Sequence, residues 1–144
     1  MNDPFYFELE DDESLIKVSC HLAGDNYNLA LDTGASNTVI DLNILLVAGY
    51  KVEDAIRIIK IETASGIIEA YVFLIAEIEA LGITRRYLEV SSYDFANNNI
   101  LSEIQGVLGL DFFKGYKFCI DMTDFEITVQ RKVRGQNTEG VSNA

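Results

Sequence analysis

The segment Leu29-Ala30-Leu31-Asp32-Thr33-Gly34-Ala35-Ser36 is an apolar strand that ends in an acidic residue and a turn of small residues. A strand of this kind presents its terminal carboxylate, here that of Asp32, at the rim of a sheet. Gly34 permits backbone angles that other residues resist, and it leaves room for a close neighbour. The hydroxyls of Thr33 and Ser36 are able to hold the acid or to fix the loop. Asp, Thr and Gly are also common turn residues, so the tripeptide alone predicts no more than a turn.

On both sides of this segment the apolar residues recur with a period of two, which indicates β-strands. Strands are predicted at residues 14–22, 27–31, 55–61, 68–78, 85–93, 116–121 and 125–130. In the strand 68–78, the side chains expected on the inner face are Ile68, Ala70, Val72, Leu74, Ala76 and Ile78. Short helices are predicted at 41–49 and 110–114, and a loop at 94–102. This pattern predicts an all-β sandwich or barrel with one or two short helices.

The composition limits what the chain binds. The 144 residues suffice for one domain with a proper core, since 49% of them are hydrophobic. The formal charge of −12 disfavours nucleic acid and anionic membrane surfaces as partners. No apolar run is long enough to cross a bilayer, and the acidic start MNDPFYFELEDDES does not resemble a signal peptide. We therefore expect a cytoplasmic protein.

The chain has two cysteines, Cys20 and Cys119, and one histidine, His21. Both cysteines lie in alternating apolar stretches and are expected to be buried. The local ligand pairs of a zinc site are missing, so we expect no metal. Cys20 and His21 are adjacent in a predicted strand and should point to opposite faces, which argues against a catalytic pair.

The stretch Asp32-Thr33-Gly34-Ala35-Ser36 resembles the active-site signature of the pepsin and retropepsin aspartic proteases. Those families also carry a buried segment of two hydrophobic residues and a glycine before a short helix, and residues 105–113, with Val107-Leu108-Gly109 at their centre, resemble it. A hairpin called the flap covers the substrate in these families, and Thr63-Ala64-Ser65-Gly66 resembles its tip in single-domain bacterial members.

The resemblance covers about residues 14–130 and implies a single-domain, retropepsin-like acid protease barrel. It leaves residues 1–13 as an N-terminal segment and residues 131–144 as a polar tail that we expect to fray. From the residues alone, Val107-Leu108-Gly109 is a buried strand ending in a glycine turn. The segment at 63–66 is equally readable as a surface hairpin turn.

The chain contains one Asp-Thr-Gly and no second Asp-Thr-Gly or Asp-Ser-Gly. Two neighbouring carboxyl groups share one proton because both cannot be negatively charged at such a short distance. The pair therefore supplies both an acid and a base for hydrolysis. Retropepsins carry one motif per chain and dimerise, so the resemblance implies a homodimer with Asp32 from each subunit, acting on a polypeptide without a cofactor.

The resemblance also implies roles for individual residues. Thr33 would hydrogen-bond across the two-fold axis, Gly34 would take part in catalysis beside Asp32, and Val107, Leu108 and Gly109 would support the loop. The residues expected to contact substrate are Ala35, Ser36, Ala64, Ser65 and Gly66. Two alternatives stay open: a catalytically silent module that uses the fold for dimerisation or peptide binding, and a metal-dependent or thiol enzyme.

Overall fold

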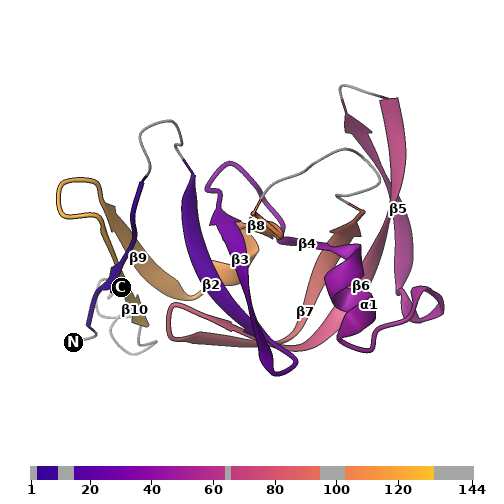
Figure 1. The fold of residues 1–144 in the computed structure, drawn as a ribbon, viewed down its shortest axis with the longest axis horizontal. Helices are drawn as coiled ribbons and strands as arrows, with labels where there is room; N and C mark the ends of the chain where they lie inside the picture. Colours follow the sequence, from indigo (N-terminus) through magenta and orange to yellow (C-terminus); the bar gives the residue numbers. More distant parts are fainter. Residues whose placement is uncertain (1–2, 10–14, 64–65, 95–102, 132–144) are drawn as a thin grey trace, which may run out of the picture.

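The computed structural model describes residues 3–9, 15–63, 66–94 and 103–131, and most of these residues are in β-strands (Figure 1). The strands are β1 (Phe5–Tyr6), β2 (Ile16–Leu22), β3 (Asp25–Leu31), β4 (Val39–Asp41), β5 (Arg57–Thr63), β6 (Gly66–Ala80), β7 (Ile83–Tyr93), β8 (Gly106–Leu108), β9 (Tyr116–Asp121) and β10 (Glu126–Arg131). The helical elements are the α-helix α1 (Leu42–Val47) and two 3-10 turns, η1 (Val52–Asp54) and η2 (Leu110–Phe113).

The larger of two sheets closes into a barrel. Its strand order is β2-β3-β8-β4-β7-β6-β5, and β2 also pairs with β6 through Cys20↔Ala80 and His21↔Glu79. Because β2 pairs with β6, the six strands β2, β3, β8, β4, β7 and β6 form a closed barrel. Strand β5 pairs only with β6 and lies outside this barrel. The smaller sheet has the order β1-β10-β9 and stands at the other side of the molecule from the β5–β6 hairpin (Figure 1). The predicted all-β barrel with short helices is thereby confirmed.

The apolar faces of both sheets and of α1 meet in one core. Its largest fully buried side chains are Phe73, Phe112, Leu29, Ile40, Leu45, Ile75, Ile78, Ile83, Leu108, Ile127 and Val90. Leu108, which ends β8, and Phe112, which lies in η2, both belong to this core. The segment resembling the hydrophobic-hydrophobic-Gly motif is therefore anchored by burial, which removes apolar side chains from water.

The helix predicted at 41–49 is present as α1. Asp41 precedes the helix, and its carboxylate accepts a hydrogen bond from the Asn43 amide at 3.3 Å, as expected of an N-cap. The amide of Ala48 donates to the Ile44 carbonyl at 2.9 Å. Gly49 then takes φ +105°, a left-handed angle that ends the helix.

For the middle of the strand 68–78, the prediction of which side chains face inward is wrong. Leu74 is 42% exposed, whereas Phe73 and Ile75 are buried. Phe73 packs edge to face on Tyr50, with ring centroids 6.0 Å apart, so the face covered here is the one beneath the segment that follows α1. A strict alternation pattern misses this because a segment from elsewhere in the chain covers the other face of β6 at this point.

The prediction for the cysteines is half right. Cys20 is buried, with His21 exposed beside it on the opposite face, but Cys119 is exposed. Cys119 lies in β9 opposite Thr128 on the outer face of the three-stranded sheet. In the described part of the chain, no helix has the length and apolar character required to span a membrane.

Candidate active site

Strand β3 ends immediately before Asp32 and lies next to β8 in the barrel sheet. Its last residues run parallel to β8, pairing Ala30 with Val107 and Leu31 with Leu108. The next amide in the chain, that of Asp32, donates to the carbonyl oxygen of Leu108 at 3.1 Å. The backbone of Asp32 is therefore fixed by a strand from a distant part of the sequence, while its side chain is exposed.

The turn after Asp32 holds the carboxylate. The amide of Gly34 donates to Asp32 Oδ1 at 2.8 Å, and the amide of Ala35 donates to the Asp32 carbonyl oxygen at 3.1 Å. Thr33 and Ser36 are exposed beside the acid. Residues 32–38, which we call the Asp32 loop, thus present a carboxylate, two hydroxyls and backbone groups to solvent.

The segment after β8 lies directly against this loop. The carbonyls of Ala35 and Ser36 accept hydrogen bonds from the amides of Leu110 and Asp111, at 2.9 and 3.2 Å. A Cβ atom on Gly109 would lie 2.6 Å from the carbonyl carbon of Asn37, so this position has room for no side chain. The structure therefore places the predicted supporting segment in backbone contact with the loop that carries Asp32.

Gly106 opens β8 at a second close approach. A Cβ atom there would lie 2.3 Å from the carbonyl oxygen of Val39, and the glycine takes φ +159°. This proximity lets β8 sit between β3 and β4, parallel to the first and antiparallel to the second. Figure 1 shows β8 beside the ends of both strands, next to the loop that joins them.

The segment predicted as the flap tip falls where β5 ends and β6 begins. Thr63 pairs with Gly66 at the end of the ladder, and Gly66 begins β6 with φ +123°. Ala64 and Ser65 lie outside the described residues. Near this end of the hairpin, Ile67 of β6 is 69% exposed, and further down β5 Ile58 is also exposed. The hairpin extends away from the barrel (Figure 1). Its exposed Ile58 and Ile67 therefore place apolar side chains in contact with solvent.

Two residues bound to the loop were missed from the sequence. Thr38 ends the loop, and both its amide and its hydroxyl donate to the carboxylate of Asp111, at 3.0 and 2.7 Å. The available signal was an acidic residue in the first turn of the predicted helix 110–114. Nothing local in the sequence connects that residue to a threonine near Asp32.

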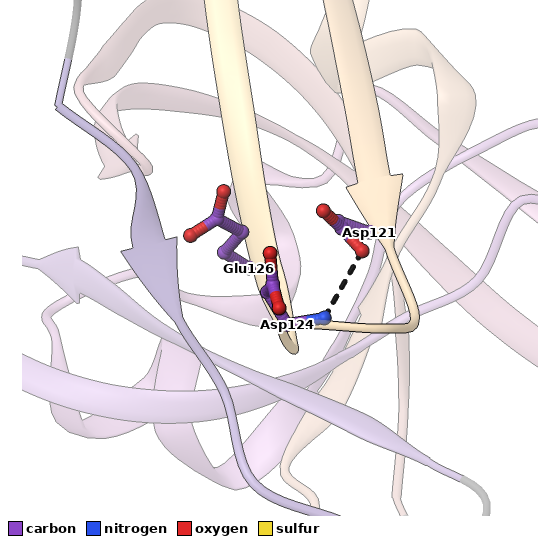
Figure 2. A group of neighbouring side chains, drawn as sticks. All are labelled: Asp121, Asp124 and Glu126. Atoms are coloured by element: carbon purple, nitrogen blue, oxygen red, sulfur yellow. Dashed lines mark hydrogen bonds between the residues drawn. The ribbon is translucent and has the colours of Figure 1, made fainter.

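A separate acidic cluster lies in the β9–β10 turn. The carboxylates of Asp121, Asp124 and Glu126 each offer an oxygen within 4.8 Å of the others (Figure 2). Asp121 Oδ1 accepts from the amides of Thr123 and Asp124, at 2.8 and 3.1 Å. These bonds are those of an ordinary aspartate-closed turn, so the turn itself explains the arrangement.

Comparison with solved structures identifies the class of fold. The structure resembles the crystal structure of a retropepsin-like aspartic protease from Rickettsia conorii, with a TM-score of 0.68 and 16% sequence identity. The match covers 89% of this chain and 100% of the other. At this identity the likeness establishes the fold, which is retropepsin-like.

The sequence itself identifies the family. Residues 18–115 match the model of the family described as "gag-polyprotein putative aspartyl protease". The matched range contains the Asp32 loop, the β5–β6 hairpin and the segment 106–113, and the chain belongs to this family. A comparison with curated proteins finds no matching sequence.

Proposed function

We propose that this protein is an aspartic endopeptidase whose active site forms when two copies of the chain bring their Asp32 carboxylates together. The observation that carries the proposal is the exposed Asp32 carboxylate, oriented by the Gly34 amide at 2.8 Å on a loop fixed to β8. Membership of an aspartyl protease family supports the reaction class and a peptide as substrate.

The chemistry requires two carboxylates in contact. One accepts a proton from the attacking water, and the other donates a proton to the carbonyl oxygen of the substrate. Because two adjacent carboxylates cannot both be charged, they hold one proton between them and titrate as a pair. A single chain of this family member offers one such acid on its loop, and a two-fold axis supplies the second.

The surrounding residues have roles that follow from the resemblance. Thr33 contacts the loop of the other copy, and Ser36 supports the outer oxygen of Asp32. Gly34 and Ala35 offer backbone groups to an extended peptide, and the hairpin turn at residues 64–66 covers it. No metal or cofactor takes part in the proposed reaction.

Mixed dimers test the proposal directly. Wild-type chain is mixed with an equal amount of Asp32→Asn chain under conditions that allow subunits to exchange, and cleavage of an unfolded protein is measured. If both acids are needed, about a quarter of the dimers retain both, so activity per total protein falls to about a quarter. Simple dilution of an enzyme that works as a monomer would leave about half.

A catalytically silent protein gives a different result. Asp32→Asn then binds peptide as tightly as wild type, and neither chain cleaves at any pH from about 3 to 8. Inhibition by a chelator or a thiol reagent, instead of by a statine-type mimic of the transition state, would point to metal or cysteine chemistry.

A further inference from the structure

Thr38 is a fully buried polar residue at the point where the Asp32 loop rejoins the sheet. Its amide and hydroxyl donate to the two carboxylate oxygens of Asp111, and its hydroxyl oxygen also accepts from the Gly109 amide at 3.1 Å. Its carbonyl accepts from the Ser91 amide at 3.1 Å. Every polar group of Thr38 is therefore paired, and this one residue joins the loop to β7 through its backbone carbonyl and to the segment after β8 through its amide and hydroxyl.

Asp111 contacts the same loop twice. Its amide donates to the Ser36 carbonyl at 3.2 Å, and its carboxylate receives both donors of Thr38. The preceding amide, that of Leu110, donates to the Ala35 carbonyl at 2.9 Å. A charged acceptor makes stronger hydrogen bonds than a neutral one, and both oxygens are used here. The turn η2 thus holds the loop at Ala35, Ser36 and Thr38.

We propose that Thr38 and Asp111 are positioning residues for Asp32. The near end of the loop is fixed by the bond from the Asp32 amide to Leu108, and the Thr38–Asp111 pair fixes the far end. The proposal rests on the proposed function, because sharing a proton requires the two Asp32 carboxylates to stay within hydrogen-bond distance. If the far end of the loop is released, the Gly34 amide and the Asp32 carboxylate that it binds can move together. The Asp32 carboxylate is then no longer held in a fixed position relative to the second Asp32.

The kinetic test uses variants that differ only in polar groups. Thr38→Val keeps the shape of the side chain and removes its hydroxyl, and Asp111→Ala removes both acceptors. We expect kcat to fall about 10-fold to 100-fold in each, since small displacements of reacting groups have effects of this size. KM should stay within about threefold, because the β5–β6 hairpin and the loop backbone still bind the peptide. Thr38→Ser, which keeps the hydroxyl, should retain most of the activity.

A matched control separates positioning from general loss of stability. Ser92 is also buried, and its hydroxyl donates to the Tyr71 carbonyl at 2.8 Å, which ties β7 to β6 and not to the Asp32 loop. Ser92→Ala should lower the melting temperature comparably and change kcat by less than about threefold. The double variant Thr38→Val/Asp111→Ala should be no slower than the worse single variant, because the two residues act as one unit.

Amide hydrogen exchange gives a readout that does not depend on activity. The amides of Gly34, Ala35 and Leu110 should exchange at least about tenfold faster in Thr38→Val than in wild type. In Ser92→Ala their exchange rates should be the same as in wild type. Should Asp111→Ala fail to fold, Asp111→Asn serves as the milder variant, since it keeps one acceptor oxygen. Equal kcat and equal loop exchange in Thr38→Val and Ser92→Ala would overturn the proposal. If Asp32→Asn keeps wild-type activity, the proposed function fails instead, and the exchange rates still decide whether the pair fixes the loop.

Discussion

The Asp32 amide donates to the Leu108 carbonyl at 3.1 Å, which continues the parallel pairing of β3 with β8 by one residue beyond the strand. The exposed acid is thus placed by backbone contacts, and the side chain of Leu108 is fully buried below it. The position of Asp32 consequently depends on how closely the backbone after β8 approaches the loop. Gly109, the next residue, is where this dependence is easiest to test.

Gly109→Ala should disturb the Asp32 loop for a purely steric reason. Gly109 has φ −92° and ψ 179°, which alanine adopts readily, so its backbone conformation gives no penalty. The added methyl group, however, would lie 2.6 and 2.7 Å from the carbonyl carbon and oxygen of Asn37. We expect a loss of about 1–3 kcal/mol in the free energy of unfolding, measured by urea denaturation, and a loss of the proposed peptidase activity.

Gly24→Ala is the matched control, because its effect is conformational and not steric. Gly24 has φ +89° in the β2–β3 turn, and a Cβ atom there would have no neighbour within 4 Å. We expect a loss of about 1 kcal/mol from the left-handed backbone and unchanged activity. Equal activity losses in the two variants would contradict the view that Gly109 acts through contact with the loop.

The sequence was most informative where a feature is local. The alternation of apolar residues and the short helix predicted at 41–49 both follow from residues within a few positions of one another, and both are present. The family resemblance placed Asp32 and Val107–Gly109, which the structure brings into backbone contact. Their roles in catalysis stay predictions.

The features missed from the sequence depend on contacts between distant segments. Thr38 and Asp111 meet only because β8 inserts between β3 and β4, and no local pattern specifies that insertion. The change of buried face in β6 at Phe73 requires Tyr50, which arrives from the segment after α1. Cys119 is exposed because one face of its strand is not covered by other parts of the protein. A short stretch of alternating residues does not show which face of the strand will be covered.

Cys20 should make the protein sensitive to alkaline pH. Burial raises the pKa of the Cys20 thiol from 9.0 to about 12, so the folded state keeps the proton that the unfolded state releases above about pH 9. The unfolded state then binds fewer protons, and stability falls as pH rises between about 9 and 12, by at most about 1.4 kcal/mol per pH unit. Below about pH 9 both states are protonated and the thiol contributes no pH dependence.

The Cys20→Ala variant isolates this contribution from that of other groups that titrate at alkaline pH. The variant is less stable near about pH 8 because a buried side chain has been shortened. The difference in unfolding free energy between wild type and variant should shrink as the pH is raised to about 11. A difference that stays constant over this range would show that the thiol ionises equally in both states.

Lys17 should control the titration of Glu103. The Lys17 ammonium lies 2.8 Å from Glu103 Oε2, and this hydrogen bond and its charge lower the pKa of the Glu103 carboxyl. In Lys17→Met the pKa of Glu103 should rise towards its ordinary value, as measured by NMR titration of the side-chain carboxyl. An unmoved pKa would mean that the pair does not persist in solution.

The same pair should matter little for stability. Glu103 is highly exposed, and solvent and salt screen such pairs. Because the folded-state pKa is lowered, whatever the pair contributes is present at neutral pH and is lost as the pH falls through that lowered value. We therefore expect Lys17→Met to melt close to wild type at neutral pH and to show the smallest difference in acid.

Arg85 should be needed in a way that its neighbour Arg86 is not. Arg85 Nε donates to the Phe112 carbonyl at 2.8 Å, and its guanidinium also donates to the Lys114 carbonyl. The same group lies 5.4 Å from the centre of the Tyr116 ring. Arg85 thereby satisfies carbonyls at the end of η2, the turn that holds the Asp32 loop, and a lysine cannot reproduce this planar, multiple contact.

Arg85→Lys should therefore lower the free energy of unfolding by about 1–3 kcal/mol, measured by urea denaturation. Arg86 pairs with Glu77 on the surface, with 3.2 Å between Nε and Oε1, so Arg86→Lys should change stability by less than about 0.5 kcal/mol. Because both variants keep the charge, any difference between them reports the geometry of the guanidinium at η2. If the two changes prove equal, the contacts of Arg85 with the end of η2 do not stabilise the fold, and the turn is held by its buried residues Phe112 and Phe113 and by the hydrogen bonds of Asp111 to the Asp32 loop.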